Sequence, residues 1–233
     1  MGGAQRYPSW LIAKRWVSLR ATHPTNPIHA GPSVVRGNHG PEFGQVKQID
    51  PDDFRIYCIL GWLGIETDDF DAARLAFEKE VSLQPRDSTA ICALANFHFY
   101  AGEPERTIEL ANRAMTMGDA GKYNSDWYVR YLLGCAHFML GDYDGAILWC
   151  KKSIAEHAIC AAPRAYLALA YAKKGDDAKA AAAVAEMLKL PAGDQLDRQF
   201  ECPKPIQTAA YRDWHKKHFL PTAKKVGLWE KGN

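Results

Sequence analysis

Residues 54–85 read FRIYCILGWLGIETDDFDAARLAFEKEVSLQP, and the order of large, small and turn-forming residues in this stretch decides the fold. The landmarks of the stretch are Tyr57, Leu60, Gly61, Ala73, Phe77 and Pro85. Large apolar residues followed by a Leu-Gly pair, an alanine, an aromatic residue and a closing proline are typical of two helices joined by a turn. The stretch therefore predicts one helix–turn–helix unit.

The same arrangement returns with a period of about 34 residues. Small residues recur at the position of Gly61, namely Ala95, Gly134 and Ala168. Glycines recur where the first helix of a unit must end, namely Gly102, Gly141 and Gly175. The second unit follows the first without a gap, five extra residues precede the third, and the fourth returns to the strict period.

Each recurring residue has a physical reason. Two antiparallel helices pack closely only where small side chains stand at their crossing, as at Gly61 and Gly134. A residue that ends a helix in the left-handed conformation is best a glycine. Acidic residues such as Asp142 and Asp176 follow these glycines directly, and they are expected to cap the positive end of the next helix.

The repeated pattern resembles the tetratricopeptide repeat family over residues 54 to about 191, as four units. The resemblance implies an all-α fold, a right-handed α-α superhelix of about four helix–turn–helix repeats with a C-terminal capping helix. It also implies a non-catalytic protein-protein interaction scaffold that binds a peptide or a helix on its concave face, without a cofactor or a metal.

The resemblance divides the chain into four parts. Residues 1–40 are basic and rich in Pro and Gly, and they predict a poorly ordered segment. Within it, WLIAKRWVSL at 10–19 could form a short basic amphipathic helix, either a targeting or membrane-surface signal or an incidental chain start. Residues 41–53 predict a partial repeat because FGQVKQIDP looks like a closing helix and proline. The repeats follow at 54–195, and 196–233 predict a capping segment.

Charge is distributed unevenly along the chain, although the net charge is only +2. Residues 41–195 carry 16 basic and 23 acidic residues, whereas 196–233 carry 8 basic and 4 acidic residues. An acidic middle argues against a groove for nucleic acid. Charged residues interrupt every apolar stretch well before the length of a membrane span. These features predict a cytoplasmic protein with a protein or peptide partner, and they leave the oligomeric state open.

Several residue groups with possible chemistry have simpler explanations. The six cysteines show no CxxC pair and predict small buried side chains in a reducing compartment. His98 and His137 occupy the same place in adjacent repeats, about 10 Å apart and too far for one metal, so they predict core or groove-wall histidines. His215 and His218 lack a third ligand at a defined spacing. No arrangement of serine, cysteine or histidine predicts catalysis.

The resemblance places the binding groove along one stripe of each first helix. The predicted groove residues are Arg55, Trp62, Glu66, Asn96, Phe99, Tyr100, Tyr128, Tyr131, Phe138 and Lys173. Trp62, Tyr100 and Tyr131 are expected to dominate binding because aromatic anchors contribute most at such surfaces. Two arrangements remain open: the aromatic residues bind a peptide, or they are covered by the terminal helix or the N-terminal segment.

The end of the chain carries a second resemblance. Tyr211-Arg212-Asp213, the stretch KKVGLWE at 224–230 and Asp126-Trp127-Tyr128 look like the repeat tails of bacterial class III adenylate or guanylate cyclases and related regulators. This resemblance implies an alternative function, a detached or truncated regulatory module of a signalling protein. Nothing in the sequence matches the catalytic part of a cyclase.

Overall fold

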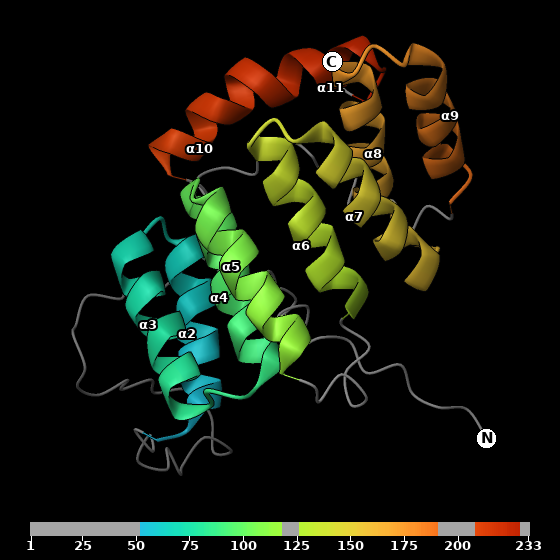
Figure 1. Cartoon of the computed structure of the whole chain (residues 1–233). Coiled ribbons are helices and arrows are strands. Elements are labelled where there is room, and N and C mark those ends of the chain that lie inside the picture. The colour runs from blue at the N-terminus through green and yellow to red at the C-terminus, as the bar shows by residue number, and fades with distance from the viewer. Residues whose placement is uncertain (1–51, 118–125, 191–207, 229–233) are drawn as a thin grey trace, which may run out of the picture.

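The computed structural model describes residues 52–117, 126–190 and 208–228, and no strand occurs in these ranges. Four pairs of helices follow one another along the chain (Figure 1). The pairs are α2 (Phe54–Glu66) with α3 (Phe70–Leu83), α4 (Ser88–Ala101) with α5 (Pro104–Thr116), α6 (Asp126–Met139) with α7 (Tyr143–Glu156), and α8 (Ala162–Lys173) with α9 (Asp177–Leu188). The all-α repeat fold predicted from the period is confirmed.

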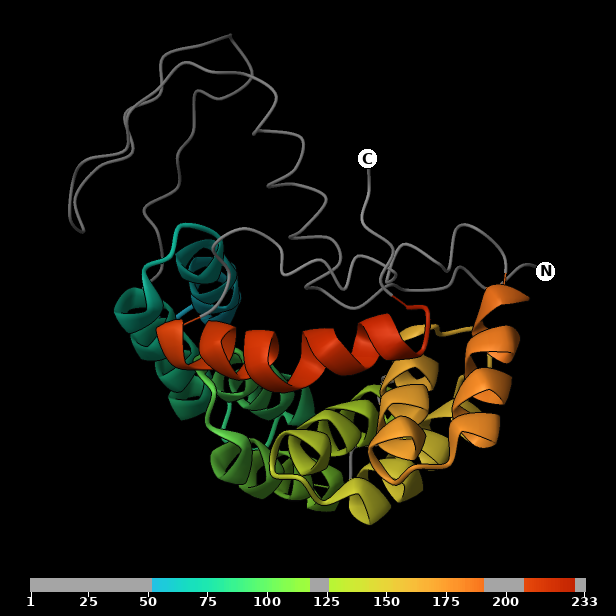
Figure 2. The ribbon, with the colours of Figure 1, turned by 90° about the horizontal axis from the view of Figure 1, so that it is seen from above.

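The pairs stack into one array. The second helix of each of the first three pairs packs on the first helix of its own pair and on the first helix of the next pair, as α3 does on α2 and α4. Seen from above, the pairs follow an arc (Figure 2). Neighbouring pairs share their buried faces, since one apolar cluster joins residues of α2 to α6 and a second joins residues of α4 to α9, with Tyr100 packed against both.

The predicted close approaches between helices occur where the small residues stand. A Cβ atom placed on Gly61 would lie 2.7 Å from the ring of Phe77, and one placed on Gly134 would lie 2.6 Å from Cys150 Sγ. Both partners come from the second helix of the same pair. Ala95 is fully buried at the equivalent position of the second pair, and so is Ala168 in the fourth.

The turn inside each pair uses a left-handed residue followed by an acid. Gly102, Gly141 and Gly175 have φ angles of 81°, 80° and 80°. Asp68 takes the same place in the first pair with a φ of 63°. The residue that follows is acidic each time, and the carboxylates of Asp69, Asp142 and Asp176 accept hydrogen bonds from backbone N–H groups of the helix they cap.

Asp68→Gly is expected to raise the free energy of unfolding by up to about 1 kcal/mol, because the left-handed conformation strains a residue with a Cβ atom. The reverse exchange, Gly141→Asp, is expected to cost a similar amount. No atom lies within 4 Å of a Cβ atom at Gly141, so this variant introduces no clash. Urea unfolding of both variants checks the prediction, which fails if the two shifts have the same sign.

The last described segment is one run of helix, here called the C-terminal helix. It comprises α10 (Ala209–Trp214), a π-helical turn (His215–Phe219) and α11 (Leu220–Lys225). Its first part packs on α4 and its last part on α8. Figure 2 shows the C-terminal helix crossing the concave side of the arc, so the predicted terminal helix lies inside the curve of the array.

Several predictions concern residues outside the described ranges. The basic segment at 1–40, the partial repeat at 41–53 except its last two residues, and the five-residue insertion stay predictions, as do the boundaries proposed for the four parts. Within the described residues, no helix has the length and apolar character that crossing a membrane requires.

Candidate functional site

The C-terminal helix is amphipathic. Tyr211, His215, Phe219 and Ala223 are buried, and their spacing of four residues places them on one face. Asp213, Lys216, Lys217 and Lys224 are exposed on the rest of the surface. The stripe of buried side chains gives this short helix a reason to pack on the array, since isolated helices of its length are marginal in water.

Aromatic rings from three different first helices of the array pack against the buried side of the C-terminal helix. The ring of Tyr211 lies 5.3 Å from that of Phe99 and 6.2 Å from that of Tyr100, measured between centroids. Further along, Trp214 lies 6.1 Å from Phe138. We call the array residues Phe99, Tyr100, Tyr131, Phe138 and Tyr166 the concave aromatic cluster.

The far end of the C-terminal helix meets the cluster in α8. The rings of Tyr166 and Phe219 lie 5.6 Å apart, and Phe138 and Tyr131 lie 5.6 Å and 5.9 Å from Tyr166. Burial raises the pKa of the Tyr131 and Tyr166 hydroxyls well above the ordinary range, so both remain neutral at physiological pH. The cluster is therefore an uncharged aromatic surface that suits an apolar partner.

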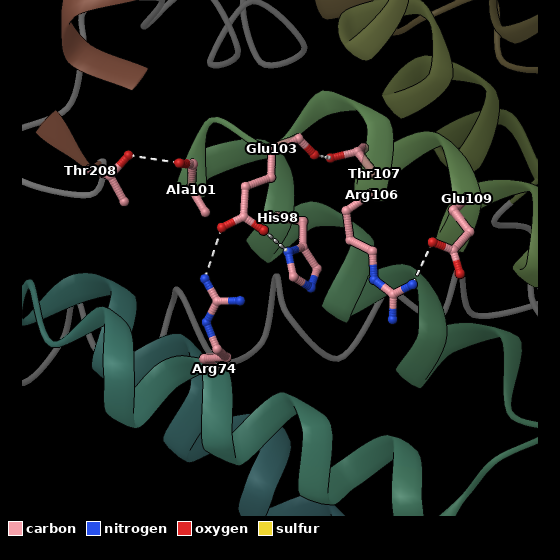
Figure 3. Close-up of polar contacts among 8 residues, drawn as sticks. All are labelled: Arg74, His98, Ala101, Glu103, Arg106, Thr107, Glu109 and Thr208. Carbon is pink, nitrogen blue, oxygen red and sulfur yellow. Dashed lines mark hydrogen bonds and ion pairs between the residues drawn. The ribbon is translucent and has the colours of Figure 1, made fainter. Parts of the chain in front are cut away.

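Polar contacts fix the start of the C-terminal helix (Figure 3). Thr208 Oγ1 donates a hydrogen bond of 2.8 Å to the carbonyl oxygen of Ala101, and the Thr208 backbone N–H donates to the carbonyl oxygen of Tyr100 at 3.4 Å. A Cβ atom on Gly102 would lie 3.3 Å from the backbone nitrogen of Tyr211. At the other end, Lys225 forms an exposed ion pair of 2.7 Å with Asp177, which contributes little.

Gly102→Ala is expected to loosen the C-terminal helix, because the new methyl group crowds the backbone of Tyr211 in addition to straining the turn. Gly141→Ala is the matched control, since its φ is nearly the same and its surroundings are open. Each variant should lose about 1–2 kcal/mol of stability from backbone strain. Amide exchange within residues 209–225 should become about tenfold faster in Gly102→Ala alone. Equal exchange in both variants would contradict the prediction.

A second polar cluster joins the first two pairs. The Glu103 carboxylate lies 2.6 Å from His98 Nδ1 and accepts a hydrogen bond of 2.8 Å from Arg74 Nη2 (Figure 3). Arg106 forms an ion pair with Glu109 nearby on α5. Burial lowers the pKa of His98, although the Glu103 carboxylate opposes this shift. The cluster ties α3 to the turn between α4 and α5, so its role is structural.

The two histidines singled out in the sequence have the same kind of partner. His137 Nδ1 lies 2.8 Å from Asp142 Oδ2, as His98 lies beside Glu103. In each case the acid stands five residues later, at the start of the next helix. Among the residues that the structure describes, no group of three or more His, Cys, Asp or Glu side chains could hold a metal ion.

The predicted groove residues do not all lie together. Phe99, Tyr100, Tyr131 and Phe138 belong to the concave aromatic cluster, and Tyr128 lies beside Tyr131 at 5.7 Å. Trp62 is buried and packs edge-on against Phe77 at 5.4 Å. Asn96 is buried and Lys173 is half-buried. Arg55 is exposed and donates a hydrogen bond to Asp53. The Glu66 side chain lies outside the described residues. A role of this set in peptide binding stays a prediction.

Sequence reasoning missed Tyr166 and the residues on the C-terminal helix. Tyr166 stands at the repeat position of Leu132. This position holds residues that pack between helices, so no sequence pattern distinguishes Tyr166 as a site residue. By contrast, the spacing of Tyr211, His215 and Phe219 is a visible signal of an amphipathic helix. Tyr211-Arg212-Asp213, which carried the resemblance to cyclase tails, lies in the first part of this helix. That resemblance stays a prediction.

Comparison with known proteins supports the class of fold. Residues 54–87 match the family model described as tetratricopeptide repeat. RNA polymerase-associated protein CTR9 of Caenorhabditis elegans is 30% identical over 107 residues, which are 45% of this chain and 9% of that protein. The aligned part of the chain thus covers less than a tenth of the length of this curated relative.

Two solved structures have the same kind of architecture. The crystal structure of the MamA protein aligns with a TM-score of 0.51 and 23% identity, over 77% of this chain and 97% of that chain. A thermophilic tetratricopeptide repeat protein of Thermus thermophilus, TTC0263, aligns with a TM-score of 0.52 and 18% identity, over 75% of this chain and 97% of that chain. The fold is therefore a helical solenoid of the tetratricopeptide-repeat type.

Proposed function

We propose that this chain is a non-catalytic protein-protein interaction scaffold that holds a helical segment of a partner protein on its concave face. The observation that supports the proposal most directly is that this face already packs a helix through the concave aromatic cluster. Proteins commonly recognise an amphipathic helix through aromatic side chains that pack against its apolar residues, which are spaced four positions apart.

The chain's own helix is suited to being replaced. Its interior contains a π-helical turn, which interrupts the regular hydrogen-bond ladder of an α-helix, and Pro221 follows this turn. Its polar contacts with the array include the Thr208 hydrogen bond to Ala101, a side-chain hydrogen bond between Tyr211 and Tyr166, and the Lys225 ion pair, which is exposed to solvent. A partner helix with large apolar residues at the same spacing would compete for the same aromatic surface.

The acidic repeat region favours a protein partner over nucleic acid, since a phosphate backbone requires a basic surface. The exposed lysines lie on the outer side of the C-terminal helix and not on the cluster itself. A cytoplasmic location is part of the proposal.

The proposal is tested on the full chain with the double substitution Tyr211→Ala and Phe219→Ala. These changes remove the ring that packs on Phe99 of α4 and the ring that packs on Tyr166 of α8, so the chain's own helix should leave the cluster. The probe is a labelled synthetic peptide of residues 208–228, and fluorescence anisotropy measures its binding. The variant is expected to bind the peptide at least about tenfold more tightly than the unchanged chain, because the competing helix has been weakened.

The matched control carries Asp213→Ala and Lys217→Ala, which remove an exposed ion pair of 2.9 Å from the same helix. This control should bind the peptide no better than the unchanged chain. Equal peptide affinity for all three proteins, or no binding to any of them, would refute the proposal.

A further inference from the structure

The first helix of the array carries an apolar stripe with no described helix packed before it. This stripe consists of Ile56, Ile59, Leu60 and Leu63. Spacings of three and four residues place these side chains on one face of α2. Ile59 is 55% exposed and Leu60 is 44% exposed. Large apolar side chains rarely remain exposed side by side without a partner surface.

The same repeat positions are covered in later first helices. Leu132, which stands where Ile59 stands, is 1% exposed and shares a buried apolar cluster with Leu110 and Ala111 of α5. Leu133, at the position of Leu60, is 0% exposed. These first helices pack on the second helix of the preceding pair, through α5 with α6 and α7 with α8. The stripe on α2 therefore has the position and chemistry of a docking face for a preceding second helix.

One contact shows how such docking works within the array. Phe97 of α4 packs against Phe77 of α3, with ring centroids 5.9 Å apart. Leu63 stands in α2 where Phe97 stands in α4. A helix docked on α2 in the same way would place its equivalent of Phe77 against Leu63.

The chain itself contains a segment in the correct register. Phe43, Ile49 and Pro51 precede Phe77, Leu83 and Pro85 by one full repeat. The connection that follows is also repeated, because Asp53 caps α2 by accepting from the Arg55 N–H, as Asp87 caps α4 by accepting from the Thr89 N–H. A helix that ends before Pro51 thus has the same short link to α2 as α3 has to α4.

We propose that residues 43–50 form the closing turns of a second helix and dock on the apolar stripe of α2, with Phe43 packed against Leu63. Phe43, Val46 and Ile49 are spaced three residues apart and so present one apolar face. An eight-residue helix is unstable alone in water, so its stability would depend on this docking. The array would then contain half a repeat before its first complete unit.

The test uses the full chain and compares Phe43→Ala with Gln48→Ala. Gln48 stands one repeat before the exposed Ser82 and belongs to the solvent side of the proposed helix. Phe43→Ala is expected to lower the midpoint of thermal unfolding by about 3–6 °C, whereas Gln48→Ala should change it by less than about 1 °C. Phe43→Ala should also speed amide exchange within α2.

A double-mutant cycle identifies the contact. In a Leu63→Ala background, the shift in unfolding midpoint caused by Phe43→Ala should fall by at least about half, because the effects of substituting two residues in contact are not additive. An unchanged shift in that background, or no shift in the parent chain, overturns the proposal. Analytical ultracentrifugation would assign the stripe to a second copy instead if the chain is a dimer, Ile59→Asp converts it to a monomer, and Phe43→Ala leaves its thermal stability unchanged. A monomer with unprotected α2 amides would assign it to a different protein.

Discussion

Replacing Gly64 with alanine is expected to lower the free energy of unfolding by about 2–3 kcal/mol, because α2 and α3 touch through backbone atoms at this point. A Cβ atom on Gly64 would lie 2.8 Å from the backbone nitrogen of Ala73 and 2.9 Å from the carbonyl oxygen of Asp69. Backbone atoms inside a packed pair cannot move aside as a side chain can. The helices would have to separate, and the loss would exceed the gain in helix propensity that alanine brings.

The control for this prediction is Gly145→Ala. A Cβ atom there meets the carboxylate of Asp142 and lies 2.6 Å from His137 Nδ1. Both side-chain ends can rotate away, although moving Asp142 weakens its cap on the Gly145 N–H at a cost of about 1 kcal/mol. Alanine is preferred over glycine in a helix by about 1 kcal/mol, so the net change should be less than about 1 kcal/mol. Urea unfolding followed by circular dichroism measures both variants. A Gly64→Ala chain as stable as the Gly145→Ala chain would show that the pair is not closely packed.

The second large effect concerns a buried carboxylate. Glu80 is 4% exposed at a repeat position that holds Ala114, Ser153 and Met187 in the other pairs. Burial raises the pKa of Glu80 from 4.5 to about 7, partly opposed by a hydrogen bond with Cys58. The folded chain therefore keeps a proton on Glu80 over a pH range in which the unfolded chain has lost it.

The sign of the pH dependence follows from this difference. The contribution of Glu80 to stability is fully present below pH 4.5 and is lost as pH rises through 7. Over that range the free energy of unfolding should fall by about 3 kcal/mol on account of this group. His215 acts in the opposite direction, since burial lowers its pKa to about 4 and stability rises with pH between about 4 and 6.5. The Glu80 effect must therefore be measured as a difference.

Glu80→Gln supplies that difference because the amide does not titrate. The stability of the Glu80→Gln chain minus that of the unchanged chain is expected to increase by about 3 kcal/mol from pH 4.5 to pH 8. Glu78→Gln, at an exposed position of the same helix, shows how much the loss of a surface carboxylate changes stability. Denaturant unfolding at a series of pH values measures both. A flat curve for Glu80→Gln would mean that the carboxylate is already ionised in the folded chain.

The repeat part of the fold could be predicted from sequence because each landmark residue meets a local requirement. Gly61 and Gly134 are needed where two helices of one pair cross, and Gly102 is needed where the chain turns left-handed. These requirements return whenever the unit returns, so the period alone places them. Asp68 shows the limit of the pattern, since it adopts the same conformation as the glycines without being one.

The candidate site could be predicted only in part. Phe99, Tyr100, Tyr131 and Phe138 followed from the repeat, which fixes the side of the first helices that faces inward. The terminal helix was only one of the occupants left open, because the repeat register stops after α9 and an apolar stripe such as Tyr211, His215 and Phe219 fits many apolar faces. Its position depends on the combined shape of α4, α6 and α8, which no local pattern records.

Hydrogen–deuterium exchange of the unchanged chain tests most directly the claim that the concave face holds a helix. Amides of residues 209–225 are expected to exchange at least about a hundredfold more slowly than in the free peptide of residues 208–228. Phe219→Ala should remove this protection while the amides of α3 keep theirs. Exchange of residues 209–225 at the rate of the free peptide would contradict the account.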